Sequence, residues 1–192
     1  MTAAVAEAMS RGMAPLLDEH HLVLLSDDPR ERRAVARRLA GQLSGLEGTR
    51  IIQVDGAAWE TLSGDAEADA ESVQAVLGGM ISRFRGTDED LRRRYLIWHD
   101  ADELLERNVV LFGQVVNALL AIAVEHEFLT VDPLVLHRVV FTGGAKLGAY
   151  AEDEAGQFCR WLRGPAGQSE PLFEGVPECL HRPPVLTYRL DG

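Results

Sequence analysis

Residues 21–40 of the chain read HLVLLSDDPRERRAVARRLA. The first five of these residues form a short, nearly continuous apolar run, which is typical of a strand buried on both faces of a parallel sheet. Asp28 and Pro29 then provide a helix N-cap and a first helical position, and Glu31 adds an acid in the first turn. Apolar residues and alanines recur at helical spacing from there to position 43. This strand-then-helix pattern predicts the first half of a βαβ unit.

The same alternation continues along the chain. We expect further strands at 51–54, 95–98, 138–141 and 185–190, and helices at 70–84, 101–127 and 152–162. Residues 1–19 predict a helical lead-in, in which Pro15 either kinks the helix or starts a shorter segment. Residues 164–184 predict an irregular connection to the last strand. Together these elements predict one α/β domain over residues 1–192, with three α/β/α layers and a mostly parallel sheet of about five strands.

Composition excludes several classes of function. Hydrophobic residues make up 46% of the chain, enough for a sizeable core, while the net charge of −11 argues against a nucleic-acid partner. The longest apolar stretch, 109–124, is too short and too interrupted to cross a bilayer, so we expect no membrane partner. No secretory signal is visible at the start, which favours a cytoplasmic protein. Cys159 and Cys179 lack metal-ligand spacing and are expected to be reduced thiols, so no metal site is predicted.

Residues 24–40 resemble the strand–loop–helix of the AAA+ and related P-loop ATPases. In an alignment without gaps, Ser26 and Glu31 take the places of the two P-loop glycines. Arg32 takes the place of the phosphate-binding lysine, and Arg33 that of the Ser or Thr that binds magnesium. The resemblance implies a P-loop NTPase-like fold, but each of these residues departs from the motif.

The departures have physical consequences for nucleotide binding. A P-loop works because glycines let backbone N–H groups curl around phosphates at a helix N-terminus. Asp27, Asp28 and Glu31 would place negative charge in that cradle, and position 33 offers no hydroxyl for a metal. The same residues are explained better as a capped helix start, with Asp28 as the N-cap. We therefore favour a capped, nucleotide-free helix.

Residues 94–104 resemble the AAA+ strand that ends in Asp-Glu-Ala-Asp. By position, His99 replaces the metal-organising Asp and Asp100 replaces the catalytic Glu. With a slip of one residue, Asp100 becomes the metal acid and Ala101 the missing base. Either alignment loses one member of the pair. In the first, neutral imidazole is a poor partner for hydrated magnesium, and in the second, alanine cannot act as the base. A simpler structural role is that His99 and Asp100 cap the long helix that follows.

Two further features complete the resemblance. Residues 139–144 are similar to the AAA+ strand that carries a polar sensor residue, with Thr142 at the position of that residue. The chain ends soon after its last predicted strand, so the helical lid that normally follows is not expected. The nucleotide-binding positions under this resemblance are therefore degenerate.

Three hypotheses of function follow. The first is a non-hydrolysing, pseudo-ATPase-like module for protein interaction or assembly, which binds another protein or itself and needs no cofactor. An exposed part of the apolar segment 109–124 would support it. The second is a divergent hydrolase that uses ATP and magnesium, with Arg32 and Asp100 active. The third is a receiver-like signalling domain, in which Asp27 and Asp28 form the acidic pair, Asp100 accepts phosphate and Thr142 is the switch residue.

Overall fold

The computed structural model describes residues 11–59, 70–85, 91–129, 135–153 and 185–190. These residues form one five-stranded sheet in which every strand pair is parallel, in the order β2-β3-β4-β1-β5. The strands are β1 (His21–Leu25), β2 (Thr49–Asp55), β3 (Arg93–His99), β4 (Leu136–Gly143) and β5 (Val185–Arg189). The predicted α/β class with a parallel sheet of five strands is confirmed.

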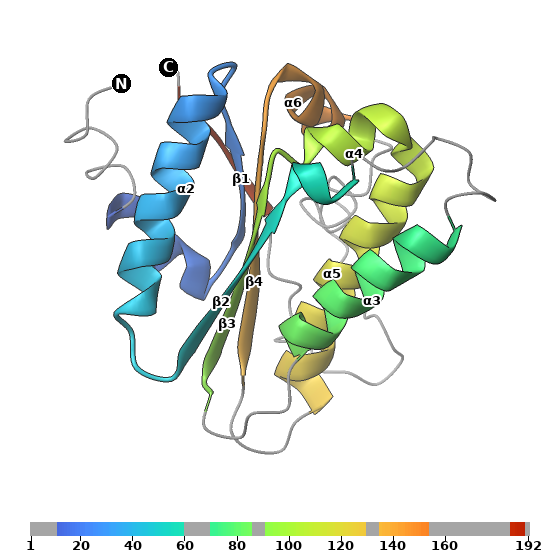
Figure 1. The fold of residues 1–192 in the computed structure, drawn as a ribbon. Coiled ribbons are helices and arrows are strands. Elements are labelled where there is room, and N and C mark those ends of the chain that lie inside the picture. The colour runs from blue at the N-terminus through green and yellow to red at the C-terminus, as the bar shows by residue number, and fades with distance from the viewer. Residues whose placement is uncertain (1–10, 60–69, 86–90, 130–134, 154–184, 191–192) are drawn as a thin grey trace, which may run out of the picture.

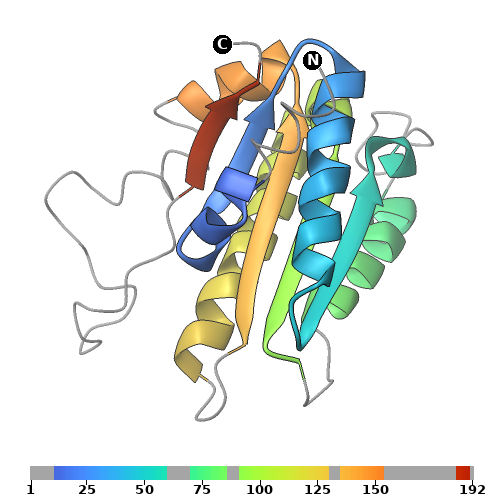
Figure 2. The same ribbon diagram turned by 90° about the vertical axis from the view of Figure 1, so that its left-hand side faces the viewer.

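Helices cover both faces of the sheet. They are η1 (Pro15–Asp18), α2 (Pro29–Ser44), η2 (Gly56–Trp59), α3 (Ala70–Arg85), α4 (Asp102–Arg107), α5 (Val109–Leu129) and α6 (Ala145–Glu152). Figure 1 shows α2 on one face and α3 and α5 on the other, so the fold has three layers. Figure 2, turned by 90°, shows α2 in front of the sheet and β5 at one edge of it. No described helix forms a lid apart from these layers.

Each face of the sheet has its own buried core. Alternate residues of β3 divide between them: Tyr95 and Ile97 pack with α2, whereas Leu96 and Trp98 pack with α3 and α5. Both sets are buried because β3 lies inside the sheet, and this explains its continuous apolar sequence. The edge strand β2 alternates between buried and exposed residues toward its end.

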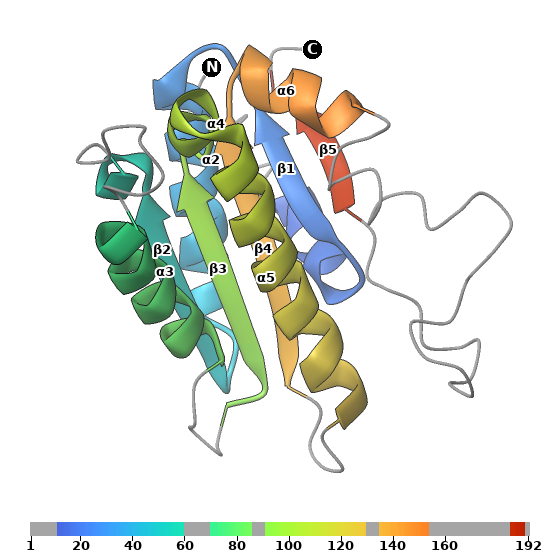
Figure 3. The same ribbon diagram turned by 90° about the vertical axis from the view of Figure 1, so that its right-hand side faces the viewer.

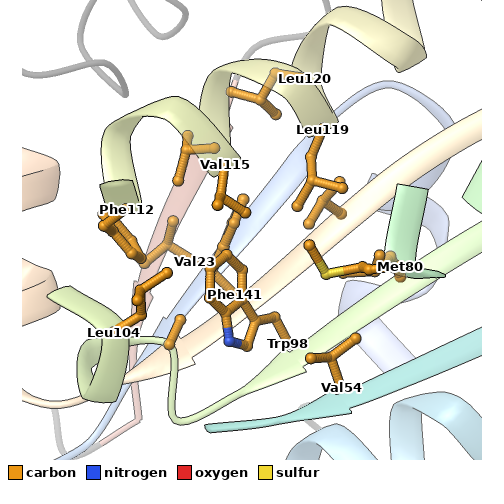
Figure 4. Close-up of a cluster of buried hydrophobic side chains, with 14 of the residues drawn as sticks. Val23, Val54, Met80, Trp98, Leu104, Phe112, Val115, Leu119, Leu120 and Phe141 are labelled. Atoms are coloured by element: carbon orange, nitrogen blue, oxygen red, sulfur yellow. The ribbon is translucent and has the colours of Figure 1, made fainter. Parts of the chain in front are cut away.

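The larger core centres on Trp98. Its ring centroid lies 5.5 Å from that of Phe112 and 5.9 Å from that of Phe141. Figure 4 shows side chains from the sheet, α3, α4 and α5 converging on this cluster. Aromatic side chains of this size bury much apolar area, so this cluster fastens α4 and α5 to the strands that carry the candidate site.

The predicted helix at 101–127 is wrong in one respect, because it is two helices. Asn108 has extended backbone angles (φ −154°, ψ 93°) between α4 and α5. Its side-chain oxygen accepts a hydrogen bond from the Leu111 amide at 2.9 Å and so caps α5. A short polar side chain that satisfies the free N–H groups of a helix start competes with helix continuation, which explains the break.

Other boundaries also differ from the prediction. Pro15 starts the short η1 rather than kinking a longer helix, which was one of the two predicted alternatives. β2 begins at Thr49 and β4 extends through Gly143, so Thr142 lies within a strand rather than after it. The sequence did not predict η2 or α6, and α6 ends at Glu152, where a helix was expected to begin. The rest of that expected helix, the connection at 164–184 and residues 1–10 lie outside the described residues.

α5 is the longest described helix. Its buried face consists of Phe112, Val115, Val116, Leu119, Leu120 and Ile122. Among the described residues, no helix has the length and apolar character required to span a membrane.

Candidate functional site

The residues singled out from the sequence meet at the carboxyl edge of the sheet. β4 lies between β1 and β3, so the ends of these three strands are neighbours. Figure 3 shows α4 and α6 at this edge, beyond the arrowheads of β1 and β3. After β1 the chain passes to one face through α2, whereas after β3 and β4 it passes to the other. In open α/β sheets, such a reversal at the strand ends is where ligands usually bind.

The start of α2 is capped by its own side chains. The Asp28 carboxylate accepts a hydrogen bond from the Arg30 amide at 2.8 Å, and Pro29 follows as the first helical residue. The Ser26 hydroxyl accepts from the Asp28 amide at 3.1 Å and donates to the Glu31 carboxylate at 3.3 Å. The predicted cap is therefore confirmed, and Glu31 contacts the Ser26 side chain. Asp27 is exposed beside it.

A buried carboxylate between two arginines forms the centre of the site. Arg32 Nε donates to Asp100 Oδ1 at 2.7 Å, and its Nη1 donates to the Ser26 carbonyl at 2.9 Å. Arg33 Nε donates to Asp100 Oδ2 at 2.6 Å, and its Nη2 also contacts the same oxygen. The side chains of Arg32 and Asp100 are 9% and 5% exposed, whereas that of Arg33 is 40% exposed. Both oxygens of Asp100 are thus occupied by cations of the same chain.

The backbone holds Asp100 in this position. Its φ of 51° lies in the left-handed region, the only such non-glycine value in the described chain. The Thr142 hydroxyl accepts from the Asp100 amide at 3.0 Å, and the Thr142 carbonyl accepts from the Ala101 amide at 2.7 Å. β4 therefore fixes the turn between β3 and α4 through both polar groups of Thr142.

The proposed capping role of His99 and Asp100 is wrong. The N-cap of α4 is Ala101, and no side chain caps it. The Asp100 carboxylate binds the two arginines instead, and only its backbone carbonyl accepts from the Glu103 amide at 3.0 Å. Asp100 and Asp102, on either side of Ala101, have separate partners. The Asp102 carboxylate accepts a hydrogen bond from the Gly144 amide at 2.8 Å.

His99 lies on the α2 side of the site and contacts a different partner. Its Nε2 is 2.9 Å from Gln53 Oε1. Burial lowers the pKa of His99 below its ordinary value, although the nearby charges of Asp55 and Asp100 oppose that change. The imidazole is therefore neutral at pH 7, and Nε2 is its donor to the amide oxygen of Gln53. Gln53 could not be singled out from the sequence, because an exposed polar residue on an edge strand is ordinary.

Arg33 links the buried pair to the surface. Its hydrogen bond to Asp100 raises the pKa of the guanidinium, with the charges of Asp100, Asp55 and Glu103 adding to the effect. Its Nη2 also lies 3.5 Å from Asp55 Oδ1 at the end of β2. The site is accordingly a small ion-pair network, deepest at Asp100 and most open at Asp55.

Glycines allow the close approach of the backbone around this network. A Cβ atom at Gly56 would lie 2.6 Å from the Asp100 carbonyl oxygen. At Gly144 it would lie 3.3 Å from the Asp102 carboxylate and 3.7 Å from Arg32 Nη1. Sequence reasoning missed both positions, although Asp55-Gly56 after a strand and Gly143-Gly144 after another are visible turn signals.

A comparison with models of known families and with curated proteins finds no match to this sequence. Within the described residues, no three or more His, Cys, Asp or Glu side chains gather as a metal site would require.

Proposed function

We propose that this chain is a non-hydrolysing, P-loop-like module that acts by binding another protein or a second copy of itself. The observation that carries the proposal is the contact of Asp100 with Arg32 and Arg33. Under the resemblance, these arginines hold the positions of the phosphate-binding lysine and the metal-binding hydroxyl. A nucleotide would have to displace Asp100 and leave a buried carboxylate without its cations, which costs about 3–5 kcal/mol.

The start of α2 gives independent support. A phosphate at a helix N-terminus is bound by free backbone N–H groups. Here the Asp28 carboxylate occupies the Arg30 amide, and the Ser26 hydroxyl occupies the Asp28 amide. Asp28 and Glu31 would also repel an incoming phosphate, so the cap and the ion pairs act in the same direction.

The strand order favours this proposal over the receiver alternative. Receiver sheets have the order 2-1-3-4-5, with β1 between β2 and β3. In this chain β1 lies between β4 and β5. The segments that resemble the two ATPase motifs follow β1 and β3 on either side of β4, and they meet through Arg32 and Asp100. Motifs that once shared a phosphate site would have this relation.

The exposed surface offers an apolar place for an interaction. Val109 and Val110, in the first turn of α5, are 55% and 67% exposed, whereas the buried face of the same helix lies in the core. The only other large hydrophobic side chain of the described residues with comparable exposure is Leu46, at 43%. Two adjacent exposed valines at one helix start are a small patch, which suits the edge of an interface.

Nucleotide binding is the first test. Calorimetric and thermal-shift titrations with ATP, ADP and GTP, with and without magnesium at matched ionic strength, are expected to give neither heat nor stabilisation at millimolar nucleotide. Magnesium-dependent binding, with turnover that Asp100→Asn abolishes, would replace this proposal with the divergent hydrolase.

Assembly is the second test. Sedimentation velocity over a wide range of protein concentration reports whether the chain associates with itself. If it does, Val110→Glu is expected to weaken the association, and Leu46→Glu on the turn after α2 serves as the matched control. A monomer at every concentration would leave a different protein as the partner.

A further inference from the structure

The buried ring of His137 contacts two backbone carbonyls at once. His137 is the second residue of β4 and is 0% exposed. Its Nδ1 lies 2.9 Å from the Val135 carbonyl oxygen, and its Nε2 lies 3.1 Å from the Phe84 carbonyl oxygen. A carbonyl oxygen only accepts hydrogen bonds, so each ring nitrogen must donate to satisfy its contact. A neutral imidazole carries one N–H, whereas an imidazolium carries two.

The Phe84 carbonyl is one that needs a donor. Phe84 lies in the last turn of α3, where the final four carbonyls of a helix have no partner within the helix. A cation at this end is also favoured by the helix dipole. The Phe84 ring itself is buried and packs edge-on against the His137 ring, with centroids 5.1 Å apart. The contact therefore joins the end of α3 to the beginning of β4.

We propose that His137 is a proton-dependent clasp: its imidazolium donates to Val135 and Phe84 and so fastens the C-terminus of α3 to the sheet. Loss of the proton removes one donor and turns a lone pair toward a carbonyl oxygen. One of the two contacts then opens. The clasp is closed at low pH and is lost as the pH rises through the titration of this ring.

Three arginines of the described residues neighbour His137 or Phe84 in the sheet or along the chain. Arg94 of β3 is opposite His137 in the register and buried on the same face. Arg85 follows Phe84 at the end of α3, and Arg138, next in β4, donates to the His137 carbonyl at 2.9 Å. Burial and these cations oppose a charged ring, while the two carbonyls and the helix dipole favour it.

His21 provides a contrast in the neighbouring strand. It is also 0% exposed, but its Nδ1 accepts a hydrogen bond from the Val139 amide at 3.0 Å. A nitrogen that accepts cannot carry a proton, so the fold requires His21 to be neutral. Burial, aided by the charges of Arg138 and His20, lowers its pKa well below the ordinary value. The two buried histidines thus make opposite demands on the same solution pH.

Nitrogen-15 NMR of the histidine rings tests the proposal directly, because imidazolium and the two neutral tautomers have distinct shifts. We expect both ring nitrogens of His137 to be protonated at the acidic end of the range in which the protein stays folded. As that proton is lost, amide protection factors in the last turn of α3 are expected to fall roughly fivefold, the size of one hydrogen bond's net contribution. Protection factors, rather than raw exchange rates, remove the intrinsic pH dependence of exchange.

His137→Gln supplies the matched variant, since its amide can donate but does not titrate. It is expected to abolish the pH dependence of protection at the end of α3, whereas His20→Gln, at a half-buried histidine outside the clasp, is expected to retain it. A single neutral tautomer of His137 throughout the folded range would overturn the proposal. An unchanged pH profile in His137→Gln would overturn it as well.

Discussion

Arg32 Nε and Asp100 Oδ1 lie 2.7 Å apart, although 68 residues separate the two in the chain. Both side chains are buried, and the contact joins the first turn of α2 to the turn that leaves β3. A buried ion pair adds little net stability over an apolar pair of the same size, but removing one partner is costly. The pair therefore links α2 to the end of β3, and the loss of stability on removing one partner is measurable.

Arg32→Met is expected to lower the free energy of unfolding by about 3 kcal/mol, because Asp100 keeps only the partly exposed Arg33 as a counter-charge. Urea unfolding followed by circular dichroism measures the effect as a lower midpoint with an unchanged slope. Arg30→Met removes a neighbouring exposed arginine of the same helix and is expected to leave the midpoint nearly unchanged. Equal midpoints for the two variants would show that the pair does not hold α2 to β3.

Asp28→Ala tests the cap that occupies the start of α2. Loss of the hydrogen bond to the Arg30 amide is expected to destabilise the protein by about 1 kcal/mol. Asp27→Ala changes the adjacent exposed acid and serves as the control. If the cap also excludes anions, Asp28→Ala should gain weak binding of inorganic phosphate, measured by calorimetry, and Asp27→Ala should not. Equal stability of the two variants would contradict the capping role.

The alternation of strands and helices along the chain was predictable, because buried strands are continuous apolar runs and an N-cap residue followed by proline marks the start of a helix. Asp28 and Pro29 mark α2 in the sequence and in the structure alike. The break at Asn108 was not predictable from periodicity, since one polar residue within an apolar segment is compatible with a continuous helix. α6 was missed because it is short and follows two glycines. Tertiary contacts stabilise it: Leu147 packs in the larger core, and Gly148 lies against Leu25 of β1.

The site could be predicted as a set of positions but not as a set of contacts. The resemblance brought Ser26, Arg32, Asp100 and Thr142 to one edge of the sheet, and they lie there. That Asp100 would bind two arginines instead of capping a helix depends on a left-handed backbone conformation. Asp adopts this conformation more readily than most residues, but tertiary contacts impose it here, so the local sequence does not predict it.

The pH dependence of stability provides a further prediction. Because burial lowers the pKa of His21, the unfolded chain binds a proton at this residue more readily than the folded one. Its contribution is fully present above about pH 6.5 and declines as the pH falls, by about 1.4 kcal/mol per unit until the folded-state pKa is reached. His99, whose pKa is also lowered by burial, acts in the same direction.

His21→Asn separates this contribution from the rest, because Asn can accept from the Val139 amide without titrating. The difference in unfolding free energy between the wild type and this variant, measured by urea titration from about pH 7 to about pH 5, is expected to change in favour of the variant as the pH falls. His20→Gln, at the half-buried histidine next to His21, serves as the control for the loss of an imidazole. A pH-independent difference for His21→Asn would contradict a neutral His21 in the folded state.

Gly56 and Gly78 provide a matched pair of glycine substitutions. A Cβ at Gly56 would lie 2.6 Å from the Asp100 carbonyl oxygen, which is itself held by the Glu103 amide, whereas a Cβ at Gly78 would meet nothing within 4 Å. Gly56→Ala is therefore expected to destabilise the protein by about 2 kcal/mol, the scale of a forced overlap. Gly78→Ala, in the exposed middle of α3, is expected to stabilise it by about 0.5–1 kcal/mol through helix propensity.

Thermal and urea unfolding of the two variants measure this contrast. If Gly56→Ala is neutral, the end of β2 can move away from the turn at Asp100 without cost. The left-handed turn would then not be fixed by its neighbours, and the ion pairs of Asp100 would have to hold it alone. In that case the double variant, Arg32→Met with Gly56→Ala, would have the same unfolding free energy as Arg32→Met alone. If the turn is rigid, the losses of unfolding free energy in the two single variants are expected not to add, because both changes act on the same turn.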